Sequence, residues 1–406
     1  MKTTHNTPTS QGFTRREGLL TLVGGVMTLA GCGGGGSSGV ATVGGGTTGS
    51  FALGPIAGLG SIICSGVRFN DDLARVLDDD GGLRNRNELK LGMMVRVKSK
   101  SKKVKTANST SADADEISFR SELLGPIDSI SSPQTTPATL KVLGQTVRIT
   151  VNTIFDEGLS LAALIAGDIV EVHGFLDPGT NALMATRIER KDPAKVNAFK
   201  LTGTVKTLST TAKTFNIGTL TISYATTSDV PANLANDQLV RVRLATTPAT
   251  GTRTALRVRA VEAEVEDREE AEVKGTITEF TSSAKFKVNG LQVDASGATV
   301  PAGLKLGDQV EVEGRLVNGV LVAKTVEVEN QNEKREFELH GIVSNKTSSS
   351  FTVTSVGGVA VKVNYTNAVT FSNGTATNLI NGAKVEVKGV TSADGTTIDA
   401  TRISFE

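Results

Sequence analysis

The chain has 406 residues, which is too long for one small domain and typical of roughly two to four domains. Its formal net charge of +1 and its 4% aromatic content, without tryptophan, exclude a general electrostatic attraction to nucleic acid and disfavour ligand binding by aromatic stacking. Abundant Val, Thr and Gly, without helical heptads, predict an all-β protein.

The N-terminal residues 1–31 predict a lipoprotein signal peptide. Arg15 and Arg16 precede an apolar stretch, residues 18–30, which is too short to span a bilayer. The stretch ends in Leu29-Ala30-Gly31-Cys32, which resembles the bacterial lipobox. We therefore expect lipidation of Cys32 and attachment to a membrane, although an ordinary signal peptide with an incidental cysteine is the alternative. Both the Sec and the twin-arginine export routes stay open.

The residue that follows Cys32 bears on the membrane to which the lipoprotein is sorted. Gly33 rather than Asp favours the outer membrane of a Gram-negative bacterium, on either the periplasmic or the surface side. Residues 32–53 are the predicted tether, in which the Gly-rich residues 33–50 predict a flexible linker with an end-to-end distance of roughly 20–25 Å. Cys64 is then the sole remaining thiol. Since no histidine neighbours it, we expect a semi-buried structural cysteine.

Five variations of one pattern follow the tether. Each copy opens on a glycine and a short strand, continues through a hairpin such as Phe286–Val293 with Asn289-Gly290 at its turn, and crosses a leucine-containing loop. Two strands complete the copy: one with alternating valines, such as Val310-Glu311-Val312-Glu313-Gly314, which we call the regular strand, and a closing strand. The predicted modules are 54–120 (degenerate), 121–191, 199–265, 271–329 and 336–406, with charged connectors at 190–197, 265–272 and 329–336.

Module size and strand number predict the fold class. Five or six strands in about 65–75 residues, with the longest connection between the third and fourth, suit a small OB-like β-barrel, and a sandwich is the alternative. In the regular strand the valines are predicted to face inward and the charged residues to face solvent. The outward charges change sign between copies, as at Glu311 and Arg241, which disfavours a shared catalytic role.

These residues resemble the bacterial lipoprotein family that carries repeated copies of the domain of unknown function 5666. The resemblance rests on Gly54-Pro55-Ile56-Ala57-Gly58-Leu59-Gly60-Ser61-Ile62-Ile63, with Gly66-Val67-Arg68-Phe69 after it, and on Val310-Glu311-Val312-Glu313-Gly314. It covers roughly residues 54–406 and implies architecture and cellular address, but no activity. The third copy departs most, because Asn236-Asp237 replaces Gly-Asp, and Arg241 and Arg243 replace the acidic face.

Two clusters are candidate binding sites. Asp78, Asp79 and Asp80 could supply oxygen ligands to Ca²⁺, although Asp-Asp-Asp-Gly-Gly is also a solvated turn without the EF-hand spacing. A basic run could contact anionic lipid headgroups or lipopolysaccharide, although the favoured interpretation is a long, polar hairpin tip. The run consists of Lys98, Lys100, Lys102, Lys103 and Lys105.

No motif indicates catalysis. HExxH, cysteine-rich spacings and Gly-x-Ser-x-Gly are absent from the sequence. His173 and His340 occupy different positions of the repeat, and both are expected at the surface. The phenylalanines at 155, 215, 286, 351 and 371 mostly occupy core positions, which disfavours nucleic acid as a partner.

The function expected from the sequence is therefore a non-enzymatic binding or scaffold lipoprotein. It would present repeated surfaces to an envelope protein, glycan or lipid, without a cofactor. The alternatives are a calcium-stabilised adhesion or structural module, and an envelope-polymer hydrolase that uses Asp168, Asp308 or Glu311.

Overall fold

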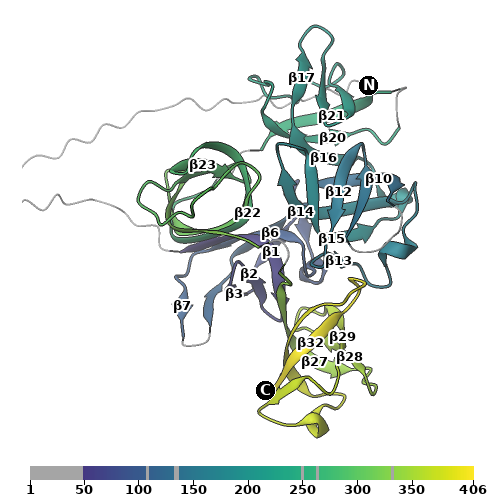
Figure 1. The fold of residues 1–406 in the computed structure, drawn as a ribbon, viewed down its shortest axis with the longest axis vertical. Coiled ribbons are helices and arrows are strands. Elements are labelled where there is room, and N and C mark those ends of the chain that lie inside the picture. The colour runs from purple at the N-terminus through teal and green to yellow at the C-terminus, as the bar shows by residue number, and fades with distance from the viewer. Residues whose placement is uncertain (1–48, 107–108, 132–136, 248–250, 262–264, 331–332) are drawn as a thin grey trace, which may run out of the picture. The chain divides into compact units, whose positions relative to one another are not determined.

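A computed structural model describes residues 49–106, 109–131, 137–247, 251–261, 265–330 and 333–406 (Figure 1). The predicted signal peptide, Cys32 and most of the predicted tether lie outside the described residues. Within these ranges the helices are four 3-10 turns, and none is long and apolar enough to cross a membrane.

Five small β-barrels follow one another along the chain, and the fourth shows their topology most simply. Its strands are β22 (Arg268–Ser282), β23 (Lys285–Val288), β24 (Leu291–Asp294), β25 (Gln309–Val317) and β26 (Val320–Val328). The first strand pairs with the second, the second with the third, and the third with the fifth in parallel; the fifth pairs with the fourth, which returns to the first. This closed order is that of an OB-like barrel, and Figure 1 shows β22 and β23 within the ring.

The other barrels repeat this order with local additions. Barrel 1 contains β1 (Ser50–Leu59), β2 (Ile62–Cys64), β3 (Val67–Asn70), β4 (Arg75–Leu77), β5 (Leu83–Arg84), η1 (Arg86–Glu88), β6 (Met94–Ser99), β7 (Val104–Lys105), β8 (Thr110–Asp113) and β9 (Glu116–Phe119). Barrel 2 contains β10 (Leu123–Ile130), β11 (Ala138–Val142), β12 (Gln145–Ile149), β13 (Ile154–Phe155), η2 (Leu161–Ala163), β14 (Ile169–Asp177) and β15 (Ala182–Arg190). The turn η3 (Pro193–Lys195) leads to barrel 3.

Barrel 3 contains β16 (Phe199–Thr204), β17 (Lys206–Ser209), β18 (Thr214–Ile217), β19 (Leu220–Ser223), β20 (Leu239–Leu244) and β21 (Arg253–Ala260). Barrel 5 contains β27 (Glu336–Ser344), β28 (Ser350–Thr354), β29 (Ala360–Asn364), β30 (Thr370–Ser372), η4 (Ala376–Asn378), β31 (Lys384–Thr391) and β32 (Ile398–Phe405). The predicted all-β fold of OB-like modules is therefore confirmed, and the longest connection in barrels 2 to 5 joins the third and fourth strands, as predicted.

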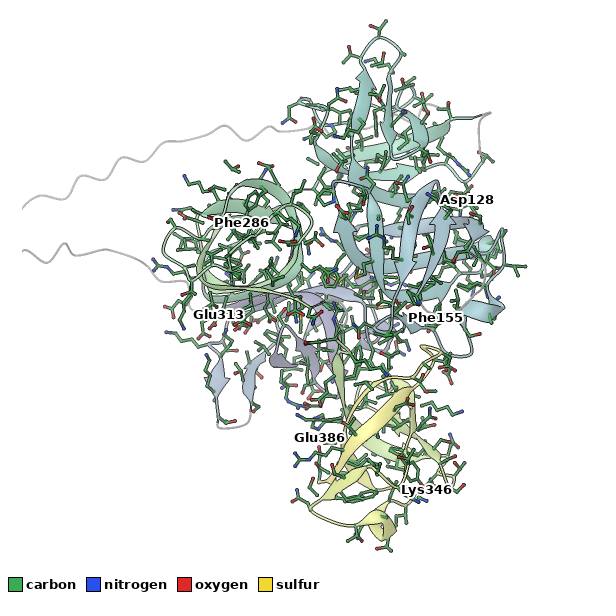
Figure 2. The ribbon with its side chains drawn as sticks, viewed as in Figure 1. Asp128, Phe155, Phe286, Glu313, Lys346 and Glu386 are labelled. Atoms are coloured by element: carbon green, nitrogen blue, oxygen red, sulfur yellow. The ribbon has the colours of Figure 1, made fainter. Side chains whose placement is uncertain are left out.

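The inward-facing valines of the regular strand form the barrel cores, as predicted. All ten are at most 1% exposed: Val95, Val97, Val170, Val172, Val240, Val242, Val310, Val312, Val385 and Val387. Figure 2 shows Phe286 inside barrel 4, where it is 1% exposed. Cys64 is also fully buried, and burial raises the pKa of its thiol to about 12, so the reactive thiolate is strongly disfavoured.

A glycine at the bulge of the fourth strand closes each of barrels 2, 4 and 5. In barrel 4 the strand register shifts between Glu313 and Gly314, where β25 crosses β26 closely. A Cβ atom on Gly314 would lie 2.2 Å from the carbonyl oxygen of Val322, which no real contact allows. Gly174 and Gly389 occupy the equivalent positions.

Replacing Gly314 by alanine is expected to lower the free energy of unfolding by about 1–3 kcal/mol, because the added methyl group must push two paired strands apart. Urea titration followed by circular dichroism measures the change. Gly297→Ala is the matched control, since a Cβ atom there meets nothing within 4 Å. Equal losses in the two variants would show that close packing at the bulge is not the cause.

Neighbouring barrels are joined by pairing between their first strands. The start of β1 pairs in parallel with β22, and its end pairs in parallel with β27, so barrel 1 contacts barrels 4 and 5 through one strand. Strands β10 and β16 likewise join barrels 2 and 3. The strand β1 begins at Ser50 rather than at the predicted Gly54, because Phe51 and Leu53 pack in the core of barrel 4. Similarly, β22 begins at Arg268, inside a predicted connector.

The prediction that outward charges of the regular strand face solvent is wrong at several positions. His173 is fully buried rather than at the surface, and Arg241 and Glu171 are largely covered. Neighbouring barrels cover parts of these faces, as where the turn between β4 and β5 contacts Lys200, Arg241 and Arg257 on the first, fourth and fifth strands of barrel 3. Burial of these faces removes the charged side chains from water, and each then requires a partner.

Candidate functional site

The aspartate run 78–80 forms a joint between barrels 1 and 3. It lies in the turn between β4 and β5, and the carboxylate of Asp78 accepts hydrogen bonds from the backbone N–H groups of Asp80 and Gly82, at 3.0 and 2.8 Å. Asp78 therefore closes its own turn. Such a turn presents the next two carboxylates outward, toward the strands of barrel 3.

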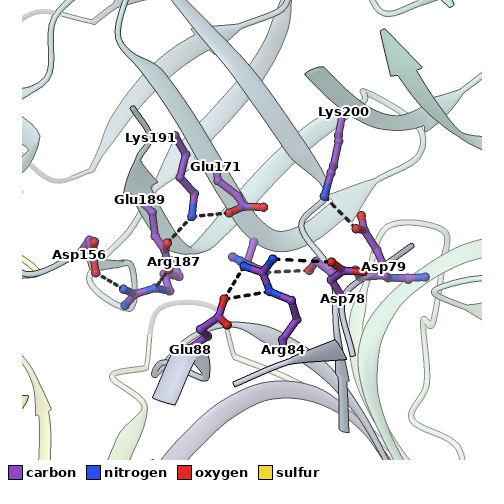
Figure 3. Close-up of polar contacts among 12 residues, drawn as sticks. Asp78, Asp79, Arg84, Glu88, Asp156, Glu171, Arg187, Glu189, Lys191 and Lys200 are labelled. Carbon is purple, nitrogen blue, oxygen red and sulfur yellow. Dashed lines mark hydrogen bonds and ion pairs between the residues drawn. The ribbon is translucent and has the colours of Figure 1, made fainter. Parts of the chain in front are cut away.

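Asp79 and Asp80 contact cationic side chains of barrel 3. Asp79, whose side chain is 5% exposed, accepts a hydrogen bond from Lys200 Nζ at 2.8 Å and lies 3.7 Å from Arg241 (Figure 3 shows the pair with Lys200). Asp80 accepts hydrogen bonds from Arg243, at 2.7 Å, and from Arg257. The three carboxylates thus have separate partners rather than converging, and this geometry favours an ion-pair joint over the calcium site considered from the sequence.

A second buried cluster joins barrels 1 and 2. Arg187, on β15, contacts the carboxylates of Asp156 and Glu189 (Figure 3). It also donates to the carbonyl oxygen of Leu91 in barrel 1. Lys191 lies 2.7 Å from Glu189. Burial opposes the charged form of Glu189, but Arg187 and Lys191 outweigh it and hold its pKa at about 2. Glu189 is therefore ionised at neutral pH, and Arg187 is the main partner of this charge.

His173 lies against the same joint. Its Nδ1 atom is 2.7 Å from the carbonyl oxygen of Arg120, to which it donates, and Nε2 has no partner among the described residues. Burial lowers the pKa of His173, despite the nearby Glu171 and Glu189. The neutral ring thus fills the interface. The period-two pattern could not reveal this, because it distinguishes the two faces of a strand but not a solvated face from a covered one.

The lysine run lies partly on the hairpin β7–β8, and each lysine has a carboxylate partner. The pairs are Lys98–Glu116, Lys100–Asp115, Lys102–Glu269, Lys103–Glu272 and Lys105–Glu313. The Lys103 side chain is 2% exposed and contacts barrel 4. Three of the five pairs thus connect barrels 1 and 4, a role that neither sequence interpretation included.

His340 lies at the joint between barrels 1 and 5. Its Nε2 atom is 2.8 Å from Glu338, and its Nδ1 atom is 2.6 Å from Glu406. Glu338 also contacts Arg68 of barrel 1, and Lys388 lies 3.2 Å away. Burial opposes a charged imidazole, but the hydrogen bonds to both carboxylates outweigh it and raise the pKa of His340.

The same cluster contains the residues that could hold a metal ion. One ligand atom each from Glu338, His340 and Glu386 lies within 4.8 Å of the others. However, Arg68 and Lys388 already balance these carboxylates, and both ring nitrogens of His340 have carboxylate partners. The arrangement therefore favours an ion-pair joint.

Stability should depend on pH through His340. Because its pKa is raised in the folded state, its contribution is complete below the ordinary value of 6.5 and is lost as pH rises through the folded pKa. We expect a loss of about 1 kcal/mol on that rise, typical of a charge-assisted hydrogen bond that is partly exposed. Urea titrations at successive pH values measure it. His340→Gln should abolish this part of the slope, and an unchanged slope would assign it to other groups.

The carboxylates considered for hydrolysis have structural partners in two barrels. Asp168 accepts from the backbone N–H of Ile165 at 3.1 Å, and Asp308 accepts from that of Lys305 at 2.9 Å, so both close equivalent turns. Glu311 lies 3.0 Å from Lys274. This arrangement provides no acid–base pair across a shared cleft.

The aromatic rings expected in the cores are mostly there. Phe155, Phe215, Phe286 and Phe351 are at most 3% exposed, whereas Phe371 is partly exposed. Stacking of a nucleic-acid base requires an accessible ring face, which the four buried residues do not offer.

A cavity of about 170 Å³ lies beside the aspartate joint. Three arginines contribute to its lining, Arg96 from β6, Arg120 after β9 and Arg241 from β20. The repeat pattern places Arg96 and Arg241 at equivalent outward positions of their strands, and the loss of the acidic face in the third copy signals Arg241. Arg120 lies outside this pattern, and no sequence signal indicates it.

Comparison with known proteins supports the repeat. The family described as "Domain of unknown function (DUF5666)" matches residues 125–189, 274–327 and 340–404, which fall in barrels 2, 4 and 5. No curated protein matches the chain. A solved structure titled "drosophila Unr CSD456" is similar at 13% identity with a TM-score of 0.14, over 52% of this chain and 97% of that chain.

Proposed function

Because this chain belongs to the family that carries repeated DUF5666 domains, we propose that it is a non-enzymatic lipoprotein of the bacterial cell envelope. Lipidated Cys32 anchors it in the outer membrane, and residues 33–49 tether the folded part. The barrels act as a scaffold that presents several surfaces to an envelope protein, glycan or lipid.

One observation carries this proposal: the charged faces of the barrels are used to join the barrels to one another. Asp79 with Lys200, Lys103 with Glu272, and Arg68 with Glu338 connect barrel 1 to barrels 3, 4 and 5, respectively. Joints of this kind fix the spacing between modules, which favours simultaneous contacts with an extended or multivalent partner. The carboxylates considered for catalysis and the thiol of Cys64 have structural roles, which supports a non-enzymatic function.

A calcium-stabilised adhesion module is the second candidate. It is weaker, because Asp79 and Asp80 already have cationic partners. Calorimetry with the Asp79→Ala, Asp80→Ala double variant separates the two readings. Heat from added Ca²⁺ in the unmodified chain that disappears in the double variant would favour the calcium module.

Two experiments test the main proposal. For the anchor, the full chain and Cys32→Ser are expressed in a Gram-negative host and fractionated, with Cys64→Ser as the control. The unmodified chain should be found with the outer membrane, and Cys32→Ser should not; identical fractionation would reject lipid anchoring.

The binding role is tested with the full chain, which is used to capture partners from envelope extracts and on glycan and lipid arrays. Background signal in every assay would reject the binding role.

A further inference from the structure

The cavity between barrels 1 and 3 is lined by three arginines and two aspartates. Besides Arg96, Arg120 and Arg241, the hydroxyl-bearing Ser118 contributes to its wall. The volume of about 170 Å³ is roughly ten times what one ordered water requires, so a tetrahedral oxyanion fits.

The adjoining face of barrel 3 has more cations than its carboxylate partners balance. Across its strands Lys200 pairs directly with Arg243, and Arg243 pairs with Arg257. Arg241 likewise lies opposite Arg259. Like charges directly opposed across strands destabilise a sheet unless anions lie between them. Asp79, Asp80 and Asp229 are the carboxylates that the structure pairs with these five cations, and the buried Glu122 also attracts Arg241.

Arg241 has unused hydrogen-bond donors. Its side chain is 18% exposed, and its Nε and Nη2 atoms have no acceptor among the described residues. A guanidinium group offers five N–H donors, and leaving them unmatched in a covered position is costly. Burial and the positive charge of Arg120 both lower the pKa of Arg241, which means that the two guanidinium groups repel each other.

The acidic residues in the lining do not remove this positive character. Asp78 accepts from backbone N–H groups of its own turn, and Asp79 accepts from Lys200 at 2.8 Å. Their negative charges are thus directed into the joint. Arg120 lies 3.3 Å from the buried Glu122, which is outside the lining, so the unmatched donors of Arg241 would make the main contacts with an anion.

We propose that this cavity binds a phosphate group, with Arg241 as its principal cationic donor and Arg120 beside it. Guanidinium groups match the geometry of a phosphate because they donate two parallel hydrogen bonds to adjacent oxygens. The group could belong to free phosphate or to a phosphorylated lipid headgroup, since both present the same oxygens. Binding would also strengthen the joint between barrels 1 and 3.

The direct test is titration of the full chain with inorganic phosphate by calorimetry, in parallel with melting curves in phosphate and in chloride at equal ionic strength. The expected results are saturable binding at one site and a melting temperature roughly 3 °C or more higher in saturating phosphate. Because each charge-assisted hydrogen bond is strong, Arg241→Gln and Arg120→Gln should each weaken binding about tenfold or more. Two variants are used because either one alone could impair folding.

Arg259→Gln is the matched control. It removes the same charge from the same sheet, but its side chain is 63% exposed and does not line the cavity. Its affinity for phosphate should change less than about twofold, as expected for a screened surface charge. Absence of binding to the unmodified chain, or equal weakening by Arg259→Gln and the cavity variants, would overturn the proposal.

Vesicles distinguish the two sources of phosphate. One set contains phosphatidate in phosphatidylcholine, and the other contains phosphatidylcholine alone. Binding to phosphatidate vesicles that Arg241→Gln abolishes supports a headgroup ligand, whereas binding of inorganic phosphate without vesicle binding supports the free ion. Anchoring through Cys32 is tested separately, so failure of one proposal does not entail failure of the other.

Discussion

Replacing Asp79 by alanine is expected to lower the free energy of unfolding by about 3–5 kcal/mol, the range for breaking a buried ion pair by removing one partner. The variant leaves Lys200 and Arg241 largely covered at the joint between barrels 1 and 3, without the carboxylate that balances them. The partly covered cations must then be hydrated, and this hydration favours separation of the two barrels. Urea titration measures the loss, and limited proteolysis shows whether the joint opens.

Asp72→Ala is the control for this prediction. Asp72 belongs to the same barrel, but its side chain is 55% exposed, and its partner Arg86 keeps a second carboxylate, Asp71. We expect a change below about 1 kcal/mol, as for a surface ion pair. A similar small change in Asp79→Ala would mean that the aspartate turn is solvated and contributes little to the joint.

Arg187→Ala is expected to have an effect of the same size, about 3–5 kcal/mol, at the joint between barrels 1 and 2. The Arg187 side chain is 5% exposed and contacts Asp156 and Glu189. Its removal leaves Glu189 buried and negatively charged, with Lys191 as a remaining partner. The pKa of Glu189, held at about 2 largely by Arg187, should rise, and part of the lost stability should return at acidic pH.

Arg190→Ala provides the comparison within the same strand. Its side chain is 48% exposed and lies 3.6 Å from Asp168. Because solvent screens such a pair, its removal should cost less than about 1 kcal/mol. If both arginines gave the same small loss, the covered cluster at Arg187 would not be a determinant of the joint.

These joints also explain how a chain of small domains reaches adequate stability. A barrel of about 65 residues buries only about 60% of its unfolded surface. Here barrels 1 and 5 share one hydrophobic cluster, and barrels 2 and 3 share another. Phe51 and Leu53 of barrel 1 extend the core of barrel 4. The barrels therefore stabilise one another by apolar packing as well as by ion pairs.

The amino-acid sequence by itself determined the individual barrels. Alternating valines such as Val310 and Val312 define an inward face because side chains alternate along a strand. The turn Asn289-Gly290 was also predictable, since both residues adopt positive φ, at 48° and 82°, which that hairpin turn requires. Both patterns depend on residues that are neighbours in the chain. The steric limits of the backbone and the burial of apolar side chains are therefore sufficient to predict them.

Only the tertiary structure decided which outward faces are solvated and which partners their charges have. Nothing in the run Asp78-Asp79-Asp80 distinguishes a calcium loop from an ion-pair joint, because its partners Lys200 and Arg243 lie more than 100 residues away. The same holds for His173, which is buried by a neighbouring barrel rather than by its own. Charge interactions depend on distance in space and on exclusion of water, and a repeat pattern specifies neither until the barrels pack together.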